Sequence, residues 1–168
     1  MRTVLALLLL CFAAKAQTPE QKLEALGHKI PAISSPIAAY VHAVRVGNLL
    51  YLSGKGPKDA SGAYIVGKLG KDLNVAQGKH AAERAALEHL AVLKAELGDL
   101  SRVKRVVKVL GMVHCTDTFT EQPQVINGYS ELMVAVFGEK GRHARSAVGH
   151  NALPLGMAVE VEVIVEVE

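Results

Sequence analysis

The sequence is poor in residues on which many functional classes depend. It has no tryptophan, four tyrosines and three phenylalanines, so it offers few aromatic surfaces on which nucleic-acid bases could stack. Its two cysteines, Cys11 and Cys115, limit any disulfide framework to a single bond. The glycine spacings of phosphate-binding loops, GxGxxG and GxxxxGK[ST], are absent, and Gly54-Lys55-Gly56 is followed by a proline. These absences disfavour base stacking, a disulfide-stapled scaffold and nucleotide binding.

Residues 1–16 have the pattern of a secretory signal peptide. Arg2 gives a positive start, an apolar run covers residues 4–14, and Ala14-Lys15-Ala16 is a small-x-small cleavage site. The run is too short to cross a bilayer, which takes about 20 apolar residues. A lipid on Cys11 is the alternative, which the large Leu10 before it disfavours. We therefore expect an exported protein, periplasmic or extracellular, with no membrane segment after cleavage.

Removal of residues 1–16 leaves a chain that is close to neutral. Arg2 and Lys15 are lost with the peptide, so 17 basic side chains face 16 acidic ones and the net charge is +1. This balance gives little electrostatic attraction for nucleic acid, which we do not expect as a partner. Cys115 is then the remaining cysteine, and we expect it to be a buried, small apolar residue.

The order of periodic segments predicts one α+β domain. Residues 17–36 are expected to form an N-terminal arm with a short helical patch, and residues 37–168 the folded domain. Strands are predicted at 40–46 and 49–53 around the Gly47-Asn48 turn, and at 103–113, 143–150 and 159–167. Helices are predicted from the Asn74 capping box to Gly98, and at 123–137. Half of all residues are hydrophobic, which is enough for the core of such a domain.

These segments predict a single mixed sheet with both helices packed on one face. In the last strand, valines at odd positions of 159–167 would point at the helices and glutamates at even positions would point away. The glutamate-bearing face must then meet water or another subunit. The glycine-rich insert at 54–72 could be a mobile lid or a rigid surface loop.

Arg145 and Glu160 are the strongest candidates for functional residues. The isolated arginine in HARSAVGH is followed by an Ala-Leu-Pro break and by the strand that carries Glu160. A guanidinium binds a carboxylate through two parallel hydrogen bonds, and a carboxyl group can transfer protons. If they faced a common cleft, the two groups could hold and hydrolyse a small anionic substrate. In the alternative, Arg145 bridges subunits and Glu160 only continues the Val/Glu alternation.

Several histidines suggest other sites, but only weakly. His80 and Glu83 lie one helical turn apart and could share a metal, although such pairs are mostly solvated surface. His114, His143 and His150 would suit a ribonuclease or a metal site, yet their spacing matches no metal signature. We therefore expect no metal site.

Three segments resemble the reactive-intermediate deaminase superfamily, also called the RidA, YjgF or endoribonuclease L-PSP family, whose subunit is chorismate mutase-like. They are YVHAVRVGNLLYLSG at 40–54, GDLSRVKRVVKV at 98–109 and ARSAVGHNALPLGMAVEVE at 144–162. The last segment combines an arginine, Leu-Pro and Glu-x-Glu at the family's spacing. The glycine-rich insert and the RSAVG variant are most similar to a less characterised branch.

The resemblance implies a homotrimer whose sheets form a barrel, with a site at each subunit interface. It also implies hydrolysis of small 2-imino or enamino acids to 2-oxo acids and ammonia without a cofactor. Arg145 matches the residue that binds the substrate carboxylate, and Glu160 matches the one that positions water. Further substrate-binding positions are matched by Tyr40, Ser53 and Asn127.

The chain departs from the archetypal family pattern at two positions. Ala147 stands where the archetype has a cysteine, so only a backbone carbonyl could orient water there. An aromatic near the start of the second helix matches Tyr129, or is replaced if Ser130 takes its place. Two other functions stay open: a non-catalytic trimeric module that binds small carboxylates at Arg145, and an endoribonuclease, which the near-neutral charge disfavours.

Overall fold

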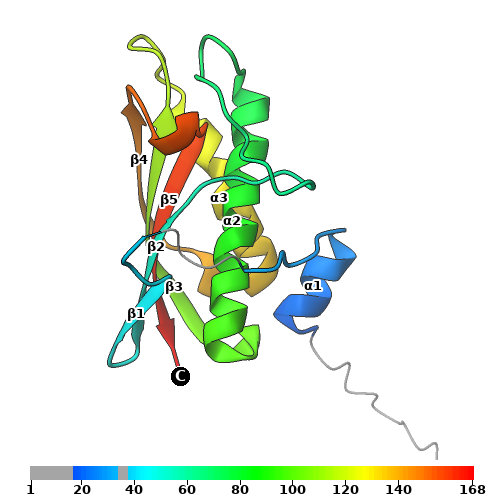
Figure 1. Cartoon of the computed structure of the whole chain (residues 1–168). Coiled ribbons are helices and arrows are strands. Elements are labelled where there is room, and N and C mark those ends of the chain that lie inside the picture. The colour runs from blue at the N-terminus through cyan, green and yellow to red at the C-terminus, as the bar shows by residue number, and fades with distance from the viewer. Residues whose placement is uncertain (1–16, 34–37) are drawn as a thin grey trace, which may run out of the picture.

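The computed structural model describes residues 17–33 and 38–168, and its elements form one mixed five-stranded sheet with helices on one face (Figure 1). The elements are α1 (Pro19–Ala25), β1 (Ala43–Val46), β2 (Leu49–Lys55), α2 (Val75–Leu97), η1 (Leu100–Arg102), β3 (Val103–His114), α3 (Gln122–Phe137), η2 (Gly138–Gly141), β4 (Ala144–His150), η3 (Pro154–Gly156) and β5 (Val159–Val167). The strand order is β1-β2-β5-β3-β4, with β3 and β4 parallel and the other pairs antiparallel. The predicted α+β fold is confirmed, whereas the predicted signal peptide lies outside the described residues.

The first hairpin forms at the predicted Gly47-Asn48 turn. Gly47 adopts φ +61°, which a side chain disfavours, and the hairpin pairs Val46 with Leu49 and Ala43 with Leu52. The first strand begins at Ala43 rather than at residue 40. Its ladder ends where β2 changes register against β5, between Leu52 and Lys55. This irregularity shapes the cavity described below.

Helix α2 has the termini that its sequence predicts. The Asn74 side chain accepts a hydrogen bond from the Gln77 amide nitrogen at 2.9 Å, and the Gln77 side chain accepts one from the Asn74 amide nitrogen at 2.9 Å. Gly98 ends the helix at φ +75°. At Gly128 of α3, a Cβ atom would overlap the carbonyl of Lys79, so the two helices approach closely there.

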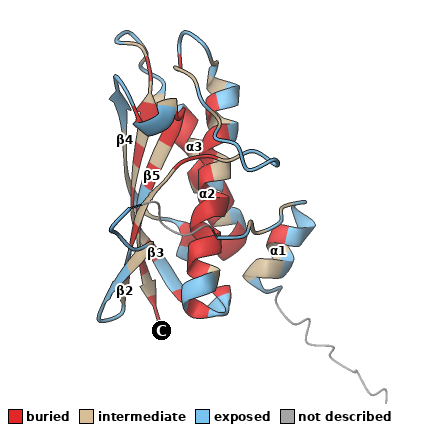
Figure 2. Ribbon diagram, in the orientation of Figure 1, coloured by how far each residue is buried: buried red, intermediate tan, exposed pale blue. Residues whose placement is uncertain are grey.

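The core lies between the helices and one face of the sheet, as the red residues in Figure 2 show. The odd-numbered valines of β5, from Val159 to Val167, are at most 2% exposed and face the helices. The alternation that the sequence predicts is therefore confirmed, and Glu160, Glu162 and Glu166 lie on the other face. Cys115 is buried, as predicted.

Through α1 the N-terminal arm packs against α3 and η1 and is tied to the last turn of α2. Leu23 is buried, while the Glu20 carboxylate accepts hydrogen bonds from Lys94 Nζ at 2.7 Å and from the Leu100 amide nitrogen at 3.0 Å. One buried side chain and one carboxylate with two donors thus hold this short helix in place.

The glycine-rich insert is attached to the body of the protein at several points. Arg84 Nε donates a hydrogen bond to the Lys58 carbonyl at 2.6 Å, and Leu69 is fully buried. Asp59 accepts hydrogen bonds from the amide nitrogens of Ser61 and Ala63, which closes a tight turn. These contacts favour a surface loop over a mobile lid.

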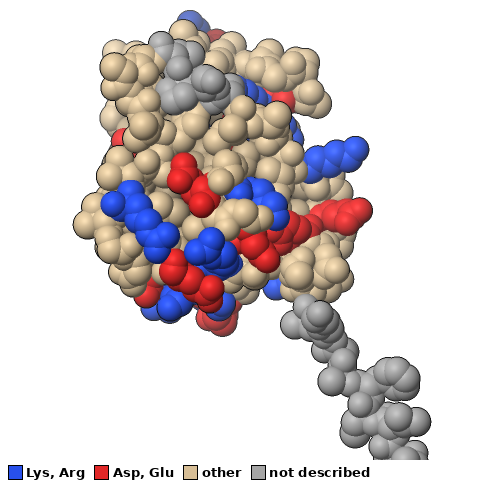
Figure 3. Space-filling view, turned by 60° about the horizontal axis from the view of Figure 1, so that its bottom comes forward, with Lys and Arg blue, Asp and Glu red and all other residues tan. Residues whose placement is uncertain are grey.

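Charged side chains of both signs are interspersed on the face shown in Figure 3, which carries no continuous basic surface. Within the described ranges, none of the helices combines the length and the apolar character needed to span a bilayer.

Candidate functional site

The Arg145 guanidinium lies on the edge strand β4 against helix α3. Arg145 pairs in register with the buried Val109, so its side chain is on the helix-covered face of the sheet. Its Nη1 donates to Asn127 Oδ1 at 3.0 Å and to Ser130 Oγ at 2.9 Å, and its Nη2 donates to the Pro123 carbonyl at 3.3 Å. Three acceptors on two turns of α3 therefore fix the fork, while Nε and one Nη2 hydrogen have no acceptor among the described residues and could bind a ligand.

Ser130 connects the guanidinium to His143. Ser130 Oγ lies 3.0 Å from His143 Nε2, and His143 Nδ1 lies 2.7 Å from the Gly141 carbonyl. Because a carbonyl can only accept, Nδ1 carries the proton and Nε2 accepts from the Ser130 hydroxyl. Burial lowers the pKa of His143, and Arg145 lowers it further, in agreement with a neutral ring. Ser130, rather than Tyr129, thus occupies the position next to Arg145.

Ala147 lies two residues along β4 from Arg145 and on the same face. It pairs with Gly111, is partly buried and packs against the core. Its side chain has no polar atom, so any chemistry at this position would use the backbone. Asn127, the other predicted substrate-binding residue of this region, holds Arg145 in place.

Glu160 lines a separate cavity of about 400 Å³ at the other edge of the sheet. The cavity is lined by Tyr40, His42, Ser53, Gly54, Lys55, Gly56, Lys58, Tyr64, Glu88, Pro154, Leu155, Met157 and Glu160. A Cβ atom on Gly54 would coincide with the Glu160 carboxylate, so the carboxylate lies directly against the backbone of β2. Burial raises the pKa of Glu160, with a smaller contribution from Glu162. A carboxyl group with a raised pKa can exchange a proton closer to neutral pH.

Tyr40 and Ser53 share the cavity with Glu160, as the resemblance implies. Tyr40 is 46% exposed, and its ring is within reach of a ligand. The Ser53 hydroxyl donates a hydrogen bond to the Val41 carbonyl at 2.6 Å, which ties the segment before β1 to the irregular end of β2.

A buried histidine supports this irregular end of β2 from the core. His89 Nε2 lies 3.1 Å from the Ser53 carbonyl, and His89 Nδ1 lies 3.1 Å from the Tyr129 hydroxyl. Since the carbonyl must accept, Nε2 carries the proton and the hydroxyl donates to Nδ1. Burial lowers the pKa of His89 to about 3, so the ring is neutral, and burial raises the pKa of Tyr129. A fully buried imidazole and phenol thus connect α2 and α3 to the Glu160 cavity.

Within one chain, Arg145 and Glu160 do not share a cleft. Arg145 pairs with Val109 and faces α3, whereas Glu160 pairs with Met112 and lies between Val159 and Val161, which face the helices. The two side chains therefore lie on opposite faces of the sheet, two strands apart. Each belongs to a different partial site.

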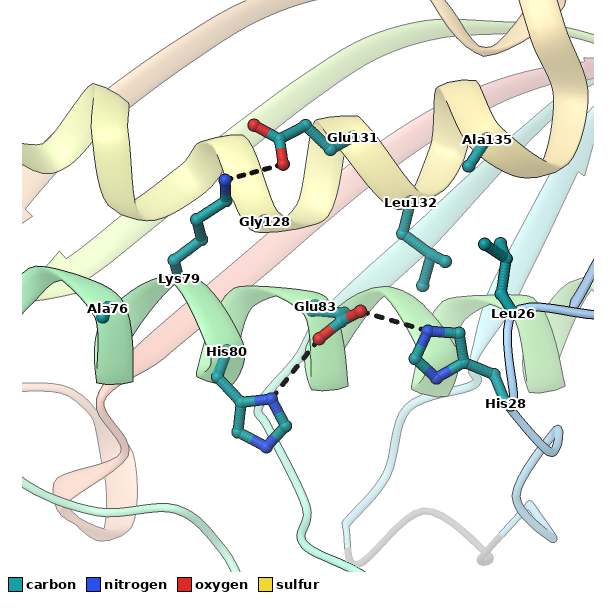
Figure 4. Close-up of a pocket in the computed structure, with 10 residues that line it drawn as sticks. All are labelled: Leu26, His28, Ala76, Lys79, His80, Glu83, Gly128, Glu131, Leu132 and Ala135. Atoms are coloured by element: carbon teal, nitrogen blue, oxygen red, sulfur yellow. Dashed lines mark hydrogen bonds and ion pairs between the residues drawn. The ribbon is translucent and has the colours of Figure 1, made fainter.

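A second cavity, of about 380 Å³, lies on the outer side of the helix pair, between α2, α3 and the N-terminal arm (Figure 4). There Glu83 accepts from His28 Nε2 at 3.1 Å and faces His80 Nδ1 at 3.3 Å, and Lys79 pairs with Glu131 at 2.7 Å. In the described part of the chain, no three His, Cys, Asp or Glu side chains are arranged to hold a metal ion. Glu83 instead fastens the arm through His28.

Two of the three other histidines named from the sequence lie side by side. His114 pairs with His150 across β3 and β4, whereas His143 lies near Ser130 at the other end of β4. His114 Nδ1 is buried without a hydrogen-bond partner among the described residues. His143 is therefore separate from the pair of His114 and His150.

Several contacts in these partial sites were not predicted from the sequence. Ser130 was named only as a possible replacement for an aromatic, and its contact with Arg145 had a signal, because Ser130 lies three residues after Asn127 and so shares its helix face. His89 also had a signal, as a polar residue on the apolar face of α2. The sequence carries no signal for the contact between Lys55 and His42, because this contact depends on the register change in β2.

Comparison with known proteins places the chain in a family. The family model described as "YjgF/chorismate mutase-like, putative endoribonuclease" matches residues 20–167. Protein TCP17 from Trypanosoma cruzi is 48% identical over 145 residues, which cover 86% of this chain and 91% of that protein.

Two solved structures show the same relationship. Atu1372 from Agrobacterium tumefaciens, described as a protein with unknown function, is 44% identical, with a TM-score of 0.84 over 89% of this chain and 92% of that one. RidA from the Antarctic bacterium Psychrobacter sp. PAMC 21119 is 28% identical, with a TM-score of 0.55 over 83% of this chain and 97% of that one. By its matching residues and its fold, this chain belongs to the YjgF/chorismate mutase-like family, to which the RidA and endoribonuclease L-PSP names also apply.

Proposed function

We propose that the protein is a cofactor-free hydrolase of small 2-imino or enamino acids, which it converts to 2-oxo acids and ammonia. The observation that supports this most directly is the fixed guanidinium of Arg145, whose remaining donors suit a carboxylate. The similarity to RidA and the raised pKa of Glu160 agree with this function.

The two partial sites fit a site formed between copies. Arg145 is on β4, one edge of the sheet, whereas the Glu160 cavity opens beside β1 and β2, the other edge. In a closed ring of three copies, the β4 edge of one copy would meet the β1–β2 edge of the next. Each interface would then bring the Arg145 guanidinium of one copy close to the Glu160 cavity of the next, whereas within a single chain the two lie apart.

Each group would have a defined part in the reaction. Arg145 binds the substrate carboxylate and so orients the C=N bond. Glu160 accepts a proton from water as the water oxygen attacks the imine carbon, and the nitrogen takes up protons. The resulting carbinolamine expels ammonia as its hydroxyl becomes the carbonyl of the 2-oxo acid. Atoms balance with water as the one co-reactant.

Ammonia release from imino acids generated in situ by an amino-acid oxidase tests this proposal. We expect release above the buffer rate, and its loss in Arg145→Ala and Glu160→Gln. Arg142→Ala is the matched control, because Arg142 is an exposed arginine near the start of the same strand that pairs with Glu139. If the wild type released no ammonia from any imine, the hydrolase proposal would fail.

Ligand binding separates this function from a non-catalytic carboxylate-binding module. A module would bind 2-oxo acids through Arg145 and would keep that affinity in Glu160→Gln. The fixed guanidinium supports both functions, and catalysis alone requires Glu160. Calorimetric binding beside the ammonia assay therefore distinguishes them.

A further inference from the structure

Lys55 places a primary amine in the Glu160 cavity. It is the last residue of β2, directly after Gly54, and pairs with Val161 beyond the register change. Its side chain is half-buried and lines the cavity together with Glu160. The irregular end of β2 therefore places a lysine side chain in the wall of the cavity that Glu160 also lines.

The contacts of this amine differ from those of an ordinary surface lysine. Lys55 Nζ lies 2.7 Å from His42 Nδ1, so an imidazole nitrogen accepts its hydrogen bond. The nearby Glu88 carboxylate lies 3.7 Å from Lys58 Nζ, and no ion pair joins Lys55 to a carboxylate in the described part of the chain. A neutral imidazole stabilises a charged ammonium group less than a carboxylate would, so this contact favours the uncharged amine.

The electrostatic surroundings act in the same direction. Burial lowers the pKa of Lys55, Glu88 partly opposes this, and the charge of Lys58 lowers it again. Desolvation of a lysine next to another cation is a known way of making its amine nucleophilic. Lys58 itself offers a comparison within the same cavity, since it is paired with a carboxylate.

We propose that Lys55 is a covalent capture site that binds small aldehydes and 2-oxo acids as an imine. The lone pair of the uncharged amine attacks the carbonyl carbon, and the carbonyl electrons move to oxygen. The nitrogen passes a proton to His42 or to water as the N–C bond forms. The hydroxyl then takes up a proton from solvent and leaves as water, while the C=N bond forms.

The geometry limits which carbonyl compounds fit. A cavity of about 400 Å³ that is lined by several polar side chains suits molecules of a few carbon atoms. This capture goes beyond imine hydrolysis and does not depend on it, because Lys55, His42 and Glu160 all belong to one chain. No oxidant or cofactor is needed, and water reverses the bond.

Borohydride trapping on the full chain tests the capture site. Borohydride reduces an imine to a stable secondary amine, so pyruvate or glycolaldehyde would leave one adduct per chain in an intact mass spectrum. Peptide mapping should place this adduct on Lys55. Because burial lowers the pKa of Lys55 and so raises its fraction of free amine, we expect Lys55 to be labelled faster than Lys58.

Two variants and one second ligand sharpen this test. Lys55→Arg keeps the cation but removes the primary amine, and should abolish the fast adduct, whereas Lys58→Arg should keep it. Equal labelling of Lys55 and Lys58 in the wild type would overturn the proposal without any variant. Glycolaldehyde has no carboxylate, so its adduct should survive Arg145→Ala. An adduct without ammonia release would refute only the hydrolase function, and ammonia release without an adduct only the capture site.

Discussion

The buried imidazole of His89 should make the stability of the protein depend on pH in a specific way. In the folded chain the ring is fully buried and its pKa is lowered to about 3, whereas an unfolded histidine has a pKa of about 6.5. Between these values the unfolded state binds more protons than the folded state. His89 therefore destabilises the fold progressively as pH falls below 6.5, and its penalty is absent above that pH.

The size of this effect follows from the two pKa values. At pH 5 the unfolded imidazole is mostly protonated and the folded one is not. This difference lowers the free energy of unfolding by about 2 kcal/mol. Well below pH 3 the limit would be about 5 kcal/mol, from 1.36 kcal/mol per pKa unit. We therefore expect urea unfolding to lose about 2 kcal/mol of stability between pH 7.5 and pH 5 through His89 alone.

His89→Gln isolates this contribution from those of other groups. The glutamine amide can donate to the Ser53 carbonyl and its oxygen can accept from the Tyr129 hydroxyl, but it does not titrate. From pH 7.5 to pH 5 the free energy of unfolding should therefore fall by about 2 kcal/mol more in the wild type than in the variant. His80→Gln, which removes an exposed imidazole from the same helix, should keep the wild-type dependence. If the free energies of unfolding of the wild type and of His89→Gln changed equally with pH, the proposed contribution of His89 would be refuted.

Two glycine substitutions test close contacts that the fold depends on. Gly128→Ala should destabilise the protein by about 1–3 kcal/mol in urea unfolding, because its Cβ would overlap the Lys79 carbonyl, and this overpacking exceeds the roughly 1 kcal/mol by which alanine favours a helix. A more stable variant would show that the helices can separate freely. Gly54→Ala should displace the Glu160 carboxylate and lower kcat/KM for imine hydrolysis by about tenfold or more, and an unchanged kcat/KM would contradict the placement of Glu160.

Much of the fold could be predicted because its signals are local. The Gly47-Asn48 turn fixes the hairpin, the Asn74–Gln77 capping box and Gly98 bound α2, and the Val/Glu alternation assigns both faces of β5. Each signal acts within a few residues, so it can be found without knowing the rest of the chain.

The candidate site was predicted less completely because its parts meet over long distances. Arg145 and Glu160 were identified, but the expectation of a common cleft ignored the pleat, which puts them on opposite faces of one chain. The contact between Lys55 and His42 depends on one register change, and that between Ser130 and Arg145 on the rotation of α3. No pattern within either segment encodes these positions.

The central place of β5 has a consequence for how the chain folds. β5 follows the other four strands of the sheet in the sequence, yet it lies between β2 and β3 and joins the β1–β2 hairpin to the β3–β4 pair. Until Val159–Val167 is available, these two halves have no common neighbour, and both would expose an unpaired edge. Completion of the sheet must therefore wait for β5, and loss of this strand would divide the sheet instead of shortening it.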